Sequence, residues 1–245
     1  MQPYFFPYLG YFQLVAAADI FVIYDDTQFI SRGWVNRNRI LVNGEPSFIT
    51  LPLKKAHLKT NINARYFVDD IEWHKKKALK AIRTSYSRAP YFEENFPLIE
   101  SIFNCAERNV AAFNENSIRE ISKYLGIATQ IRVSSALGVG TELCAQERIF
   151  ALLSGLGAAA MITPIGGINL YSCDEFMKHG IDLRFIKMND IAYRQFGSDF
   201  SPNLSIIDVF MFMRRSEIEA RLSDYTLIKN FSDTAADYDD FCVVR

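Results

Sequence analysis

Two adjacent carboxylates, Asp25 and Asp26, follow the apolar stretch IFVIY near the start of the chain. Paired carboxylates can hold Mg²⁺, accept hydrogen bonds from a sugar, or act as a base toward an amine. Aspartate is also common in turns at strand ends, so a purely structural turn is the alternative. We favour a catalytic role, because a second turn suited to ligand binding lies just upstream.

That second turn is the tetrad Tyr8-Leu9-Gly10-Tyr11, between an expected short strand and a helix. In the nucleotidyltransferase and pantothenate synthetase class, the two histidines of H-x-G-H bind the phosphates of ATP at such a turn. The segment FPYLGY resembles that element in position and in its glycine, with phenols at Tyr8 and Tyr11 in place of both imidazoles. Phenols donate hydrogen bonds but are not cations near pH 7. Tyr8 and Tyr11 are therefore candidate donors toward an acyl or phosphoryl oxygen, and an aromatic core segment is the alternative.

The segment RGWVNRNR is the most specific polar cluster of the chain. Arginine binds phosphate or carboxylate through two hydrogen bonds, asparagine recognises amides or sugar hydroxyls, and tryptophan stacks on a base or a sugar ring. A solvated edge strand is the alternative. The candidate substrate-binding residues here are Arg32, Trp34, Asn36, Arg37 and Asn38, joined by Lys54 after Pro52.

Small or polar residues follow three later segments that read as strands or loops. Ser134 and Ser135 follow one expected strand, and Gly166 and Gly167 follow the next, where small side chains let a phosphate or acyl group approach closely. Tight turns alone are the alternative. Tyr193 and Gln195 add polar groups to an otherwise apolar last third of the chain.

The elements that must position these residues read as α/β. Apolar strands are expected over residues 1–6, 19–26, 129–133, 158–163 and 182–187, with helices between them, and Asn43-Gly44 predicts a hairpin. Strand, helix, strand within about 26 residues predicts parallel pairing. We therefore expect one mainly parallel, Rossmann-like (nucleotidyltransferase-like) sheet with an inserted β-hairpin and extra helices.

In such a sheet, ligands bind beyond the carboxyl ends of the strands. Most candidates stand just after expected strands, so their side chains should meet at one edge. The residues expected around one cavity there are Tyr8, Tyr11, Asp25, Arg37, Ser134 and Gly166.

The chain has 245 residues, nearly half of them apolar, which is enough for one sizeable core. We expect a single α/β domain over residues 1–230, with the hairpin and helices inserted at about 28–126, and an acidic C-terminal tail over 231–245. No repeat or linker divides the chain.

The distribution of charge and cysteines limits the kinds of ligand, compartment and metal site that we expect. Residues 30–88 hold 13 Lys+Arg against 4 Asp+Glu, which indicates an anionic small molecule such as a nucleotide sugar, unless this is only a solvated basic surface. No apolar run is long enough for a membrane span, and no signal peptide is recognisable, so we expect a cytoplasmic protein without a DNA partner. The four cysteines lack metal spacing, so no metal site is assigned, and a nucleotide with Mg²⁺ is a cofactor that the sequence leaves open.

The chain resembles the WbqC-like proteins over about residues 2–215. The resemblance rests on QPYFFPYLGYFQL, FVIYDDTQFISRGWVNRNRI, LPLKK, TSYSRAPYF, SSALG, the pattern Gly-Gly-x-x-x-Tyr ending at Tyr171, Tyr193-x-Gln195 and LSIIDV. It adds Tyr171 to the substrate-binding candidates. Genes of this family often accompany clusters for O-antigen, capsule and other surface polysaccharides, which implies the decoration of an amino sugar.

We therefore expect a transferase that forms an amide on an amino sugar, by acyl or aminoacyl transfer, with a nucleotide- or lipid-diphosphate-linked substrate. Asp25 or Asp26 would take a proton from the amine, Ser134 would donate a hydrogen bond, and Arg32, Arg37 and Lys54 would hold the diphosphate. The alternatives are an ATP-dependent nucleotidyltransferase or ligase, and a non-catalytic sugar- or nucleotide-sugar-binding protein.

Overall fold

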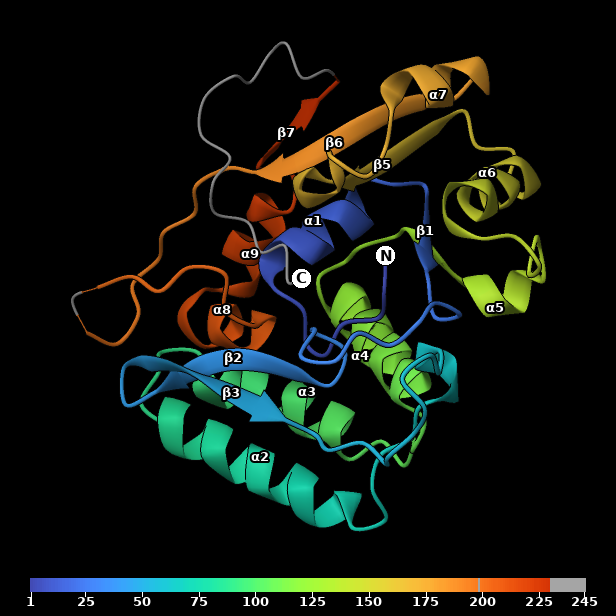
Figure 1. Cartoon of the computed structure of the whole chain (residues 1–245). Coiled ribbons are helices and arrows are strands. Elements are labelled where there is room, and N and C mark those ends of the chain that lie inside the picture. Colours follow the sequence, from blue (N-terminus) through green and yellow to red (C-terminus); the bar gives the residue numbers. More distant parts are fainter. Residues whose placement is uncertain (198, 230–245) are drawn as a thin grey trace.

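The computed structural model describes residues 1–197 and 199–229 of the chain. These residues form a mixed α/β fold in which helices surround small sheets (Figure 1). The expected acidic tail lies outside the described residues, and the single domain over residues 1–230 stays a prediction.

The strands are β1 (Ile20–Ile23), β2 (Arg37–Val42), β3 (Glu45–Thr50), β4 (Gln130–Val133), β5 (Ala160–Pro164), β6 (Asp182–Met188) and β7 (Tyr225–Ile228). The helices are α1 (Leu9–Ala16), α2 (Ile71–Tyr86), α3 (Phe92–Phe103), α4 (Val110–Tyr124), α5 (Ser134–Leu137), α6 (Ala145–Gly155), α7 (Cys173–Lys178), α8 (Ile206–Phe212) and α9 (Arg215–Arg221). Two short 3₁₀ helices are η1 (Ile62–Ala64) and η2 (Ile165–Gly167).

Strands β1 and β4 form a two-stranded parallel sheet. Their register ends with Ile23 opposite Val133, so the residues that follow, Asp25 on one side and Ser134 on the other, leave the sheet at the same edge. Parallel pairing thus brings together residues that are more than 100 positions apart in the sequence.

Strands β2 and β3 form the antiparallel hairpin that the sequence predicts, and this prediction is confirmed. Asn43 and Gly44 both have positive φ, 55° and 84°, as the central residues of a type I′ turn require. The side chains of Asn38 and Ile40 are buried, and α2 packs against β2 on that side. The opposite face of the hairpin therefore carries Arg37 and Arg39.

Strand β6 is central in the third sheet, where it pairs parallel with β5 and antiparallel with β7. Helix α1 packs against β5 and β6, so this sheet and the hairpin lie on different sides of α1 and α8 in Figure 1. The expectation of one mainly parallel sheet is wrong: β1–β4 and β5–β6 pair in separate sheets. Strands β1 and β5 have only four and five residues, so they offer few backbone N–H and C=O groups for pairing with a further strand. A Rossmann-like sheet is not confirmed.

Residues 1–6, expected as the first strand, form a segment outside any named strand that bends at Phe5 and Phe6, where the φ of Phe6 is 40°. Three buried side chains hold its carbonyl groups. The Nδ2 of Asn38 donates to the carbonyls of Phe5 and Phe6 (3.1 and 2.8 Å), the Nδ2 of Asn114 donates to Pro3 (2.9 Å), and the hydroxyl of Ser205 donates to Phe6 (2.7 Å). Side chains thus satisfy the backbone groups that a neighbouring strand would otherwise satisfy.

The rings of Phe5 and Phe6 pack into the largest hydrophobic cluster of the core and so anchor residues 1–6 there. Phe6 stacks on Phe103 with ring centroids 5.1 Å apart, and Phe5 stacks on Phe113 at 6.3 Å.

Among the described residues, no helix is both long and apolar enough to cross a membrane.

Candidate active site

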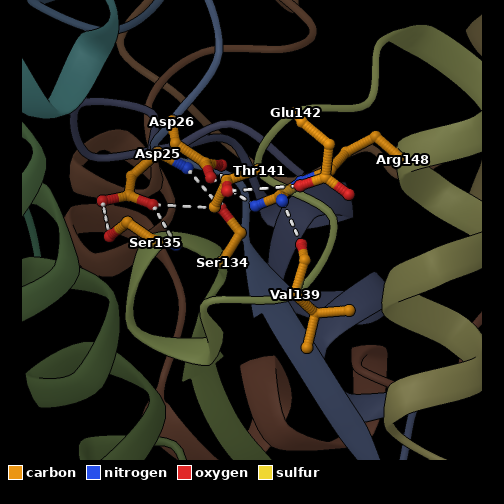
Figure 2. Close-up of polar contacts among 8 residues, drawn as sticks. All are labelled: Asp25, Asp26, Ser134, Ser135, Val139, Thr141, Glu142 and Arg148. Carbon is orange, nitrogen blue, oxygen red and sulfur yellow. Dashed lines mark hydrogen bonds and ion pairs between the residues drawn. The ribbon is translucent and has the colours of Figure 1, made fainter.

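Asp25 is buried directly after β1, and two serines hold its carboxylate. Ser135 donates its hydroxyl (2.7 Å) and its backbone N–H (3.0 Å), and the hydroxyl of Ser134 lies 3.0 Å away (Figure 2). Both serines stand directly after β4, because α5 begins where β4 ends. The parallel register of β1 and β4 therefore builds this contact.

The hydroxyl of Ser134 lies between two carboxylates. It accepts a hydrogen bond from the backbone N–H of Asp25 (3.2 Å) and is within hydrogen-bond distance of both Asp25 and Asp26 (Figure 2). A hydroxyl has a single proton, so it can donate to one carboxylate at a time. The other carboxylate then lacks the proton of Ser134.

Arg148, on α6, completes this centre. Its guanidinium group pairs with the carboxylate of Asp26 at 2.5 Å and also donates to the carbonyl of Val139. Only 3% of the arginine side chain is exposed, against 16% of the Asp26 side chain. A buried arginine in this position fixes the orientation of Asp26 and offsets part of the negative charge of the two carboxylates.

Tyr24 directly precedes the two carboxylates in the chain, and a second phenol, Tyr171, interacts with Tyr24. Burial raises the pKa of Tyr24, nearby Asp26 raises it further, and Arg148 lowers it. Burial also raises the pKa of Tyr171, and its interaction with Tyr24 adds to the rise. Both side chains therefore stay protonated at neutral pH and can donate a hydrogen bond. Tyr171 follows η2, so the loop after β5 comes close enough to Tyr24 for the two side chains to interact.

The two glycines of η2 differ in their surroundings. Gly166 is exposed, and a side chain added there would meet nothing within 4 Å. A Cβ on Gly167 would lie 3.4 Å from the ring of Tyr171. Gly167 thus supports the position of Tyr171, and Gly166 leaves open space.

A hollow of about 280 Å³ gathers much of the basic segment. Arg32, Asn36 and Arg37 line it, as the sequence suggested for a binding site, and Arg65 joins them from the residue after η1. The guanidinium groups of Arg37 and Arg65 lie over the rings of Phe48 (4.4 Å) and Phe29 (4.7 Å). Arg37 lines this hollow, but Asp25 and Asp26 are not among its lining residues.

The family model for the WbqC-like protein family matches residues 2–220. The chain belongs to this family. The chain is also 29% identical over 221 residues to an uncharacterised protein of Mycobacterium tuberculosis, an alignment that covers 85% of this chain and 90% of that protein. No solved structure matches the chain.

In this WbqC-like protein, the two tyrosines of the YLGY tetrad pack into the structure. Tyr11 is 1% exposed, and its hydroxyl donates to the carbonyl of Gln2 at 2.9 Å. The ring of Tyr8 covers Gly10 so closely that an added Cβ would lie 2.4 Å from it, and burial raises the pKa of Tyr8 to about 12. Gly10 thus makes room for the neighbouring ring of Tyr8.

Three other candidates take part in buried networks of the WbqC-like chain. Asn38 donates to the carbonyls of Phe5 and Phe6 and so holds residues 1–6 in place. Tyr193 and Gln195 both donate to the carboxylate of Asp208, at 2.7 and 2.8 Å, and Tyr86 donates to its other oxygen at 2.7 Å. This buried aspartate and its three donors tie α2 to α8, so their side chains are occupied by protein contacts.

Two candidates lie at the surface. The ring of Trp34 lies 6.1 Å from that of Phe48 on the outer face of the hairpin. Lys54 forms an exposed ion pair with Asp69 at 2.6 Å. In the described part of the chain, no group of three or more His, Cys, Asp and Glu side chains is placed to hold a metal ion.

The sequence pointed to the aspartates and serines of the centre but gave no reason to single out Arg148, Tyr24 or Arg65. Arg148 looks like an ordinary basic residue of an amphipathic helix, and Tyr24 like the last residue of a strand. Among the arginines that the structure describes, Arg148 stands apart through its buried ion pair with Asp26.

Proposed function

We propose that this protein is a transferase that forms an amide on an amino sugar during surface-polysaccharide biosynthesis. The observation that carries the proposal is the pair Asp25–Asp26, held by Ser134, Ser135 and Arg148 at the carboxyl ends of two parallel strands. A fixed carboxylate with limited solvent access suits the removal of a proton from an attacking amine. Membership of the WbqC-like family supports the polysaccharide setting.

In the proposed reaction, the amino group of the sugar attacks the carbonyl carbon of an activated acyl or aminoacyl donor. The new C–N bond forms as the bond from the carbonyl carbon to the leaving group breaks. The proton lost by the amine passes to Asp26 and from there to the leaving group or to water. Tyr24 and Tyr171 supply the hydrogen bonds that stabilise the negative charge on the acyl oxygen.

We assign the proton transfer to Asp26 because it is the more accessible carboxylate. Asp25 is 4% exposed and has three donors around it, whereas 16% of the Asp26 side chain is exposed. Asp25 is then a positioning residue that holds Ser134 and Ser135. Ser134 directs its proton to either carboxylate as charge moves during the reaction.

The test begins with a thermal-shift screen of nucleotides, nucleotide-linked amino sugars and acyl donors, since a ligand that binds only the folded state raises the melting temperature. Pairs of stabilising ligands are then incubated with the protein, and the sugar is analysed by mass spectrometry. We expect an amide on the amino sugar without ATP consumption. Consumption of ATP would indicate a ligase instead, and stabilisation without any product would indicate a binding protein.

A further inference from the structure

We propose that the hollow lined by Arg32, Arg37 and Arg65 binds the diphosphate of the sugar carrier. This inference rests on the proposed function for the identity of the sugar, but the anion site itself stands on separate observations. Arg65 is the new member of the site, since nothing in the basic segment RGWVNRNR points to it.

The first observation is uncompensated charge. In the described part of the chain, no carboxylate forms an ion pair with any of these three guanidinium groups, whereas seven other arginines form one. Like charges that share one hollow repel each other, and a bound anion removes this cost. Burial also lowers the pKa of Arg65, which indicates that its charge is poorly solvated there.

The second observation is that donors remain available. Arg37 donates to the carbonyls of Gly33 (3.2 Å) and Arg32, and Arg65 donates to that of Lys54 (3.3 Å). These bonds use fewer N–H groups than a guanidinium has. The Nε of Arg65 is buried and has no acceptor within the described structure. Rings of Phe48 and Phe29 under the two guanidinium groups hold them in place for a ligand.

The third observation connects the hollow to the carboxylates. Residues 25–29 run beside residues 60–63, joined by backbone hydrogen bonds from Asn63 to Asp25 (2.9 Å), Ile62 to Thr27 (2.9 Å) and Phe29 to Thr60 (3.1 Å). Asp25 stands at one end of this strip, and Phe29, which lines the hollow, stands at the other. Four residues of extended chain span at most about 14 Å. A sugar linked to a diphosphate has a comparable length, so one substrate can reach both places.

Three guanidinium groups match the charge and the fork-like acceptors of a diphosphate better than those of a single carboxylate. A diphosphate links the sugar to its carrier both in nucleotide sugars and in isoprenyl-linked sugars. Phe48, 51% exposed beside Arg37, offers a ring for a nucleoside base, and Ile30, 49% exposed beside the hollow, offers an apolar contact for an isoprenyl chain.

The experiment measures the binding of inorganic pyrophosphate, a nucleoside diphosphate and an isoprenyl diphosphate to the full chain by titration calorimetry. We expect binding that weakens at least about tenfold in Arg65→Gln, the loss of one charge-assisted hydrogen bond, and that weakens as salt is raised. Arg37→Gln should act alike. The control is Arg83→Gln, an exposed arginine of α2 that pairs with Glu100 outside the hollow.

Tighter binding of the nucleoside diphosphate assigns a soluble carrier, and tighter binding of the isoprenyl diphosphate assigns a lipid carrier; either result supports the site. Absence of diphosphate binding by the wild-type chain, or equal affinities in Arg65→Gln, Arg83→Gln and the wild type, overturns it. Asp26→Asn should leave pyrophosphate affinity within about twofold. Failure of the transferase proposal, with no product formed, is therefore separable from failure of the diphosphate site.

Discussion

Arg148 and Asp26 form an ion pair across 122 positions of the sequence, and 3% of the arginine side chain is exposed. The pair joins α6 to the loop after β1. Strand β1 itself pairs with β4, so its sheet hydrogen bonds do not reach α6. The ion pair therefore fixes the carboxylate centre and also contributes to the stability of the fold.

Arg148→Met should lower the free energy of unfolding by about 3 kcal/mol, because it leaves Asp26 without its buried partner. Urea unfolding followed by circular dichroism measures the loss. The matched control is Arg184→Met, which breaks an exposed pair with Asp182 and should cost less than about 1 kcal/mol. The double variant Arg148→Met/Asp26→Asn should recover part of the loss. Equal costs for the two arginines would contradict the structural role given to the pair.

Asp26→Asn should lower turnover by roughly two to four orders of magnitude, since asparagine keeps the shape but cannot accept a proton. Asp25→Asn should lower stability as well, because Ser135 then loses its charged acceptor. Product formation on the substrate found in the screen, measured beside unfolding, separates the two effects. The exposed Asp174 supplies the control Asp174→Asn. Normal turnover in Asp26→Asn would refute the general-base role of Asp26.

Asn38→Ala should cost about 2 kcal/mol of stability, because it leaves the buried carbonyls of Phe5 and Phe6 with fewer donors. Denaturant unfolding at constant pH is the measurement, and Asn169→Ala at an exposed position is the control. If Asn38 instead contacts substrate alone, the variant should unfold like the wild type and lose only ligand affinity.

Asp208→Asn should change how stability depends on pH. Burial raises the pKa of Asp208 above its usual value of 3.8, so the folded state holds this proton more tightly than the unfolded state. Its contribution to stability is complete below the unfolded pKa and falls as the pH rises through the folded pKa. Relative to the wild type, the asparagine variant should therefore become more stable as the pH rises above about 4. Parallel curves for the two proteins between pH 3 and 7 would refute this sign.

Local patterns in the sequence predict local structure well here. The turn at Asn43-Gly44 follows from neighbouring residues, and the hairpin it predicts is confirmed. The contact of Asp25 with Ser134 also follows from the sequence, because residues at the ends of parallel strands meet at one edge, and their role in a site stays a prediction.

The pairing of sheets and the buried polar contacts could not be predicted in this way. Which strand lies beside β4 or β6 depends on packing between distant segments, and an apolar strand fits several partners equally well. The pattern QPYFF looks like a strand, but Asn38, Asn114 and Ser205 supply its hydrogen bonds. Likewise, no spacing reveals that Tyr193 and Gln195 share a buried aspartate 13 to 15 positions away.

The hydrogen bond from the hydroxyl of Ser205 to the carbonyl of Phe6 has a consequence for the order of folding. The two residues are 199 positions apart, and both are buried. A contact of such long range forms slowly, because the whole intervening chain must first be brought together. During synthesis, residues 1–6 leave the ribosome long before Ser205 exists, so the carbonyl of Phe6 must wait for this donor, whereas the rings of Phe5 and Phe6 can pack earlier on Phe113 and Phe103. We therefore expect the N-terminal segment to reach its final hydrogen bonding only once Ser205 and α8 have been synthesised.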